Sequence, residues 1–110
     1  MPRFIVTGNY TASAMKAMVA RPSDREAAAR AIVEAAGGKL ESFYMTTGES
    51  DFAIKVTIDD ATDLIAGLLA TGASGSVSNL KTVRAFTSDE FTAMQKKAGK
   101  LAAAYKAPGS

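Results

Sequence analysis

Hydrophobic residues recur along the chain with two different periods, which predict strands and helices in alternation. The clearest two-residue period covers residues 51–58, where the apolar positions are Phe52, Ile54, Val56 and Ile58. Residues 39–46 alternate well enough for a second strand, with Leu40 and Tyr44 on one side and Phe43 and Met45 on the other. The polar turn at residues 47–50 joins the two strands as a hairpin. A first strand is expected from Phe4 to the Gly8 turn, and a weaker edge strand over residues 77–85.

Apolar residues at spacings of three and four predict helices between these strands. The first helical region starts at Thr11 and is interrupted by Pro22, because proline cannot continue a helix without losing a hydrogen bond. The spacing of Ser23 and Glu26 is that of a capping box, so a second helix is expected to begin there and to end at Gly37-Gly38.

A third helix is expected between the strand over residues 51–58 and the edge strand over residues 77–85. Asp59 or Asp60 can cap it, and a glycine at Gly72 ends it. Its apolar stripe has the spacing i, i+3, i+4, i+7, i+8, through Ala61, Leu64, Ile65, Leu68 and Leu69.

A terminal helix is predicted over residues 88–105, followed by a frayed tail at residues 106–110. Thr87 and Glu90 have capping-box spacing, and Phe86 and Phe91 flank them as a hydrophobic staple. Its apolar residues recur at alternating threes and fours, as in a heptad pattern.

The order β, α, β, β, α, β predicts a single α+β domain of ferredoxin-like architecture over residues 1–110. In this fold two helices cover one face of a four-stranded antiparallel sheet, and the other face stays open. Apolar residues occur on both sides of the first strand and of residues 39–46, more than a solvated face needs. We therefore expect a homodimer or a higher oligomer that buries the second face.

Composition excludes several classes of site. The chain contains no cysteine and no histidine, which removes thiolate nucleophiles, imidazole bases, histidine-ligated haem and nearly every zinc site. We expect neither a metal nor a cofactor. The net charge is only +2, from 13 basic and 11 acidic residues, so the charge does not indicate binding to nucleic acid. No apolar run reaches membrane-spanning length and no secretion signal is evident, so a cytoplasmic location without membrane contact is expected.

Four segments resemble the GYD family, small bacterial and archaeal proteins of ferredoxin-like, dimeric α/β-barrel type. In chain order, they are Phe4-Ile5-Val6-Thr7-Gly8-Asn9-Tyr10-Thr11, Gly37-Gly38-Lys39-Leu40-Glu41-Ser42-Phe43-Tyr44, Gly48-Glu49-Ser50-Asp51-Phe52 and Thr82-Val83-Arg84-Ala85-Phe86-Thr87. In the Gly-x-Tyr-Asp motif that names the family, this chain has serine at Ser50, so no role of that tyrosine carries over. The resemblance implies the fold and a dimer, and it implies no established activity.

The polar face of the best strand carries the first candidate site. Lys55 lies on this face, and Arg84 is expected on the same sheet surface together with Tyr44 or Glu41. Inside a dimeric barrel these groups can bind a small organic anion or polarise a carbonyl. The alternative is that they form ion pairs between strands or subunits.

Two further groups have a structural alternative beside a functional one. Asn9, Tyr10 and Thr11 lie where the first strand meets the first helix, where they can receive a ligand or only cap the helix. Asp51 follows a glycine turn and is the candidate general base, with Tyr44 as the other catalytic candidate. Shaping the turn is the commoner role of such an aspartate.

The acidic cluster Asp59, Asp60 and Asp63 can hold Mg²⁺ or Ca²⁺ in principle, but its place before a helix favours capping.

These patterns lead to a homo-oligomeric small-molecule-binding or accessory module, with its ligand enclosed between the sheet and a partner subunit. The first alternative is a cofactor-independent isomerase or monooxygenase that uses Asp51 or Tyr44. The second is a purely structural assembly protein. The residues leave open whether the protein is an enzyme, and they do not identify a ligand.

Overall fold

The computed structural model describes residues 1–109 and confirms the α+β ferredoxin-like prediction. Its elements are β1 (Arg3–Tyr10), α1 (Ala12–Ala20), α2 (Arg25–Ala35), β2 (Lys39–Met45), β3 (Phe52–Thr57), α3 (Ala61–Ala73), β4 (Val77–Ala85) and α4 (Ser88–Leu101). The strands form one sheet in the order β2-β3-β1-β4, and every neighbouring pair is antiparallel.

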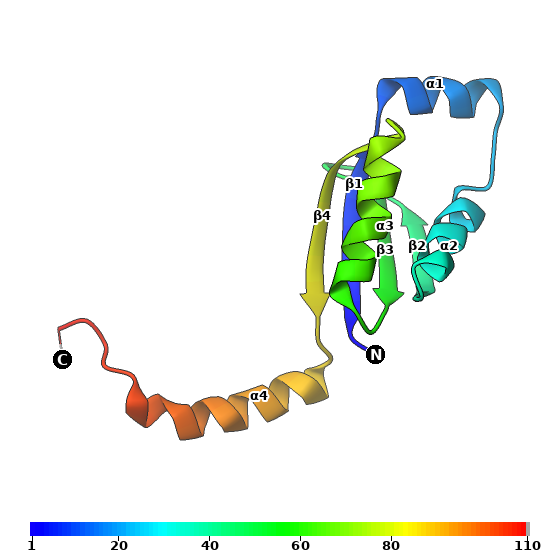
Figure 1. Cartoon of the computed structure of the whole chain (residues 1–110). Coiled ribbons are helices and arrows are strands. Elements are labelled where there is room, and N and C mark those ends of the chain that lie inside the picture. The colour runs from blue at the N-terminus through cyan, green and yellow to red at the C-terminus, as the bar shows by residue number, and fades with distance from the viewer. Residues whose placement is uncertain (110) are drawn as a thin grey trace.

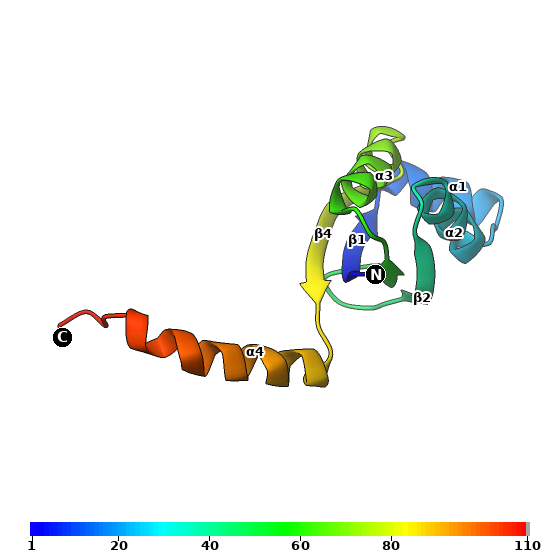
Figure 2. The same cartoon turned by 60° about the horizontal axis from the view of Figure 1, so that its bottom comes forward.

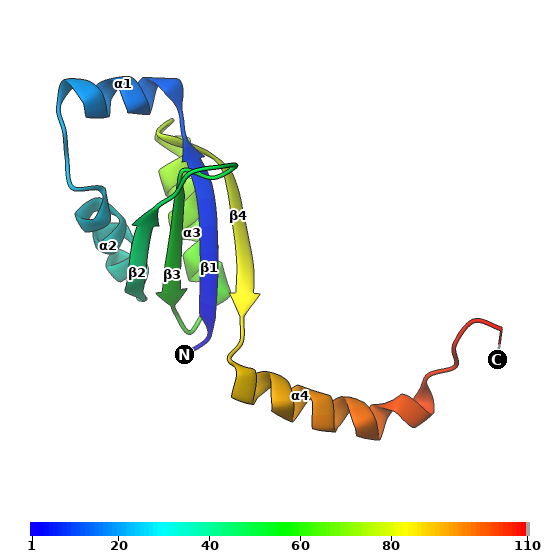
Figure 3. The ribbon, with the colours of Figure 1, turned by 180° about the vertical axis from the view of Figure 1, so that it is seen from behind.

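The helices α2 and α3 cover one face of this sheet, and the core lies between the two layers (Figures 1 and 2). The alternating residues of β3 and the residue after it supply the centre of the core, because a strand points every second side chain to the same face. Val6, Val56 and Ile58 are the largest side chains with almost no exposed surface. The opposite face of the sheet, called the open face below, carries no helix from residues 1–109 (Figure 3).

A bulge in β2 decides which of its side chains reach the core. The register of β2 against β3 shifts between Leu40 and Ser42, so that Leu40 pairs with Val56 and Phe43 pairs with Ile54. Without the extra residue, the strand period would put Leu40 and Phe43 on opposite faces, as the sequence predicts. The prediction that they lie on opposite faces is wrong, and both contribute to the helix-covered side.

The ends of the helices follow capping chemistry with one difference from the prediction. The carboxylate of Asp24, not the hydroxyl of Ser23, caps α2 by accepting a hydrogen bond of 3.1 Å from the Ala27 amide. Asp60 caps α3 by accepting hydrogen bonds from the amide and the hydroxyl of Thr62, and these bonds lower the pKa of its carboxyl.

The last helix, α4, projects beyond the β4 edge and away from the rest of the chain (Figures 1 and 3). The predicted capping box of Thr87 and Glu90 is confirmed. A short 3₁₀ helix, Ala102–Ala104, follows α4. The last residue of the predicted tail, Ser110, lies outside the described residues. Within residues 1–109 there is no helix of the length and hydropathy that crossing a membrane requires.

The start of α4 is expected to be sensitive to acid. Glu90 accepts hydrogen bonds from the Thr87 amide and from the guanidinium of Arg3, which lower its pKa from 4.5 to about 2. Because the folded-state pKa is the lower one, the stabilising contribution is complete above pH 4.5 and is lost as the pH falls toward 2.

An NMR titration of the Glu90 carboxyl carbon measures this shift directly. We expect its midpoint near pH 2, together with fraying of the first turn of α4 over the same range. In Glu90→Gln the amide of Thr87 should no longer respond to pH between 4.5 and 2. A midpoint close to 4.5 in the unmodified chain would contradict the capping geometry.

Candidate functional site

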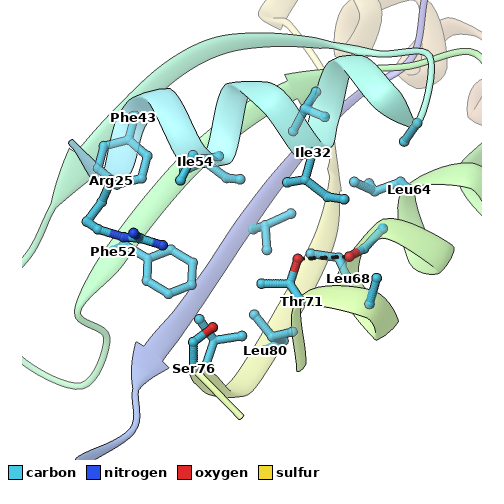
Figure 4. Close-up of a pocket in the computed structure, with 18 of the residues that line it drawn as sticks. Arg25, Ile32, Phe43, Phe52, Ile54, Leu64, Leu68, Thr71, Ser76 and Leu80 are labelled. Atoms are coloured by element: carbon cyan, nitrogen blue, oxygen red, sulfur yellow. Dashed lines mark hydrogen bonds between the residues drawn. The ribbon is translucent and has the colours of Figure 1, made fainter. Parts of the chain in front are cut away.

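A cavity of about 300 Å³ lies between α2, α3 and the helix-covered face of the sheet (Figure 4). Each layer contributes to its lining, mostly with apolar side chains. The larger ones are Ile32, Phe43, Phe52, Ile54, Leu64, Leu68 and Leu80. The volume is at the lower end of the range in which proteins hold small organic ligands.

Small residues on the two covering helices leave this space unfilled. Between the larger side chains of α2 and α3 that line the cavity lie several small residues, namely Ala28, Ala29, Gly67 and Ala70, and Ala36 directly follows α2. A methyl group or a hydrogen atom cannot span the gap between two helices and a sheet. The cavity is therefore a direct consequence of alanine-rich helix sequences laid over a sheet with large side chains.

Gly67 gives a first test of the cavity. An added Cβ would lie 3.7 Å from the Ala36 Cβ and 3.8 Å from the Ile32 Cγ1, which is ordinary van der Waals contact. Because glycine inside a helix costs about 0.5–1 kcal/mol relative to alanine, Gly67→Ala should raise the free energy of unfolding by about that amount. Urea denaturation measures it, and a decrease would show that the space is smaller than described.

Among the residues that the structure describes, Arg25 is the one charged residue that lines the cavity. Its Nε has almost no accessible surface and no hydrogen-bond partner among residues 1–109. Its Nη1 donates to the Ser23 hydroxyl at 3.2 Å, and no carboxylate in the described part of the chain lies within ion-pair distance of it. The close-up shows its side chain extending beside the ring of Phe52 (Figure 4). A cation with unused hydrogen-bonding capacity thus borders an apolar space.

The serine and threonine hydroxyl groups that line the cavity are already engaged. Thr71 donates to the Gly67 carbonyl at 2.9 Å, and Ser74 donates to the Thr71 carbonyl at 2.6 Å. Ser76 shares a hydrogen bond of 2.8 Å with the Ser74 hydroxyl. These bonds are local to the end of α3, so Arg25 is the group best placed to recognise a polar atom of a ligand.

The sequence prediction that Lys55 and Arg84 share one sheet surface is wrong. Lys55 pairs with Ile5 on the open face. Arg84 pairs with Phe4, whose own partner Val56 is in the core, so its side chain projects on the helix-covered side. There its guanidinium carbon lies 4.7 Å from the centre of the Phe86 ring and 5.8 Å from that of Phe4.

The other open-face candidates lie near the β2 edge of the sheet. Tyr44 pairs with Ala53, and two-thirds of its surface is exposed. Glu41 lies at the β2 bulge and accepts a hydrogen bond of 3.0 Å from the Thr57 hydroxyl. Neither residue lines the described cavity.

Asn9, Tyr10 and Asp51 come together at the end of β1. The Tyr10 amide donates to the Asp51 carboxylate at 2.9 Å, and the Asn9 side chain donates to the Glu49 carbonyl at the same distance. The hydroxyl of Thr11 caps α1 by accepting from the Ala14 amide. These contacts tie the β2–β3 turn to β1, which matches the structural alternative. Only Tyr10 of this group lines the cavity, with its ring centre 5.3 Å from that of Phe52.

Arg25 was not among the candidates from the sequence, although one signal was present. It is the first residue of α2, where the helix dipole disfavours a cation. A basic residue in that place gains nothing from the helix dipole, which points to another role for its side chain.

The antiparallel sheet, its two covering helices and the cavity between the layers define the chain as a ferredoxin-like α+β protein. The model of the GYD domain family matches residues 4–94, and the chain belongs to this family. A search of curated proteins found no significant match.

Three solved structures resemble the chain at low sequence identity. A protein from Thermus thermophilus has a TM-score of 0.52 at 17% identity, over 80% of this chain and 96% of its own. A Neisseria meningitidis transcriptional regulator, described as a complex with L-Met, has a TM-score of 0.50 at 15% sequence identity. The match covers 79% of this chain and 51% of the regulator. A hypothetical protein of Pyrococcus horikoshii has a TM-score of 0.46 at 17% sequence identity, and the match covers 79% of this chain and 92% of that protein. At these identities the likeness shows the fold alone.

Proposed function

We propose that this protein binds a small organic molecule with an apolar body and an anionic group in the cavity between α2, α3 and the sheet. The observation that carries the proposal is the buried, unpaired Nε of Arg25 beside an apolar cavity of about 300 Å³. A buried donor without a partner is costly. A carboxylate or sulfonate in the cavity would form a charge-assisted bond with the guanidinium of Arg25 once this side chain turns its nitrogen atoms toward the ligand. The apolar walls would take up the remainder of the ligand.

This proposal moves the anion site that the sequence predicts to another place. Lys55 and Arg84 lie on opposite faces, so they do not form one anion site in a single chain. Membership in the GYD family and the fold shared with a regulator that is described as a complex with L-Met are compatible with a binding module.

A pair of fluorescent probes tests the site without knowledge of the natural ligand. 1-Anilinonaphthalene-8-sulfonate has an aromatic body and a sulfonate, and N-phenyl-1-naphthylamine has the same body without the charge. We expect both to bind. Arg25→Gln should weaken sulfonate binding about tenfold and leave the uncharged probe within about twofold, because only the former pairs with the guanidinium.

Arg30→Gln is the matched control, because Arg30 lies on α2 but not along the cavity, and pairs with Glu26 at 3.1 Å. It should change neither affinity. Far-UV circular dichroism should show that all variants are folded. An equal loss of both probes in Arg25→Gln, or no loss of either, would contradict the anion-pairing role.

The second part of the proposal concerns assembly, as a dimeric α/β barrel formed by two open sheet faces. Ile5 and Val83 pair across β1 and the edge strand β4 on the open face, and the two residues are 39% and 56% exposed. An apolar cross-strand pair of this kind gains by burial against a second copy. Lys55 and Tyr44 would then lie at or near the contact, where an ion pair or a small organic anion can engage them.

Sedimentation equilibrium tests this pairing. The unmodified chain should dimerise at micromolar concentration, and Val83→Lys should weaken the dimer at least about tenfold because it places a charge in an apolar contact. Ser78→Lys, on the same strand and exposed, is the control that adds the same charge near the end of the ladder. A monomeric unmodified chain would contradict the pairing and would leave the probe-binding test unaffected.

A further inference from the structure

The helix α4 presents an apolar stripe to solvent along its whole length. Phe91, Met94 and Leu101 follow one another at helical spacing and are 57%, 38% and 60% exposed, and no residue of α4 is buried. Lysines lie mainly on the other sides of the helix, so it is amphipathic without an apolar surface of its own chain beneath it (Figures 1 and 2).

The size of the exposed surface indicates what covers this stripe. The chain exposes 7511 Å², whereas a compact monomer of this mass exposes about 5,800 Å². Its radius of gyration is 18.0 Å, against about 13 Å for a compact domain of this length. The excess of about 1,700 Å² per chain would give about 3,400 Å² for a pair, which is the size of an obligate homodimer interface.

The direction of α4 is fixed where the helix begins. The capping box of Thr87 and Glu90 closes its first turn, and the Glu90 carboxylate also forms an ion pair of 2.6 Å with Arg3 at the start of β1. These bonds hold the helix as a defined element that extends from the sheet, in contrast to a loose tail. The family model ends at residue 94, within α4, so it includes Phe91 and Met94 of the stripe but not Leu101.

We propose that α4 is an exchanged arm, which packs the stripe of Phe91, Met94 and Leu101 against the body of a second copy of this chain. The α4 arm of each copy would pack on the α+β domain of the other copy, so that the excess exposed surface of each chain is buried in the dimer. This inference goes beyond the proposed sheet pairing, because it adds a second, separate contact between the two copies. A second copy is favoured over an unrelated partner because the excess surface of two chains matches one complete dimer interface.

Charge-neutral substitutions test the stripe on the full-length chain. Met94→Gln combined with Leu101→Gln should weaken dimerisation at least about tenfold in sedimentation equilibrium. Thr92→Gln combined with Ala93→Gln places the same amide on the opposite side of α4 and should leave the dimer constant within about twofold. Glutamine is a good helix former, so α4 is expected to remain helical in both variants, and circular dichroism checks this.

A mixed dimer tests the exchange directly. Because the chain has no cysteine, Gln95→Cys gives a single site for a paramagnetic label on α4. A ¹⁵N-enriched chain without the paramagnetic label is mixed with a ¹⁴N chain that carries it. The amides in the α+β domain of the ¹⁵N chain should then be broadened, which only an arm from the other copy can cause. Absence of such broadening in a dimeric sample would overturn the proposal.

The remaining outcomes separate the arm from the sheet pairing. If Val83→Lys weakens the dimer and Met94→Gln/Leu101→Gln does not, the pairing stands and the exchanged arm is wrong. If only the stripe variant weakens the dimer, the arm stands and the sheet contact is wrong. A chain that stays monomeric up to the highest concentration, with the stripe either exposed or folded back on its own sheet, overturns both.

Discussion

Replacing Ile58 by alanine should destabilise the protein by about 2–5 kcal/mol, the usual cost of removing a buried aliphatic side chain from a core. Ile58 is 1% exposed and lies directly after β3, where its amide donates to the Pro2 carbonyl at 3.0 Å. Domains of this size have net stabilities of about 5–15 kcal/mol, so the loss is a large fraction of the total. The thermal midpoint should fall by about 10 °C or more.

Ile65→Ala is the matched control, because it makes the same chemical change at a side chain of α3 that is 45% exposed. It should cost about 1 kcal/mol or less, since much of the side chain is in water in the folded state as well. Both variants are compared by urea denaturation monitored by circular dichroism, at one protein concentration because pairing would add to the apparent stability. Equal losses at Ile58 and Ile65 would contradict the described position of the core.

The sequence is most informative where local chemistry alone decides the structure. The alternation over residues 51–58 predicts β3 and its buried face, and all four of its apolar residues are in the core. The caps at Asp60 and Thr87 are also local, since each acceptor reaches an amide two or three residues further on. These features depend on a few neighbouring residues, so one sequence is enough to find them.

Features that depend on the register between strands were not predicted correctly. The bulge at Glu41 brings Leu40 and Phe43 to the same face, and nothing in the local alternation of β2 shows where an extra residue is accommodated. The sequence places Arg84 on the face of Lys55, but β4 pairs with β1 in a register that aligns Val83, not Arg84, with Ile5. A shift of one residue moves every side chain of a strand to the other face.

The candidate site was missed for a related reason. Its cavity forms because small residues on α2 and α3 meet over the sheet, and those residues are far apart in the chain. Alanine in a helix is ordinary in sequence terms, since it has the highest helix propensity. Only the packing of the two helices shows that these alanines leave space, and only that space gives the side chain of Arg25 a place to act.

Filling the cavity from α2 should therefore weaken binding and increase stability at the same time. Ala29 lies against the core and lines the cavity, so Ala29→Leu adds three carbon atoms to the unfilled volume. We expect both fluorescent probes to lose affinity by at least about tenfold, and the free energy of unfolding to rise by about 0.5–2 kcal/mol. The opposite signs of the two effects distinguish occupation of the cavity from general disruption of the fold.

Ala31→Leu makes the same change on an exposed position of α2 outside the cavity, and it should leave both probe affinities unchanged. Equilibrium fluorescence titration and urea denaturation measure the two quantities on the same samples. If Ala29→Leu is less stable than the unmodified chain, the larger side chain overpacks the cavity. Probe binding is then measured in Ala29→Val, which adds only two carbon atoms. If the probes bind a folded Ala29→Leu as tightly as the unmodified chain, they occupy another surface and the cavity is not the ligand site.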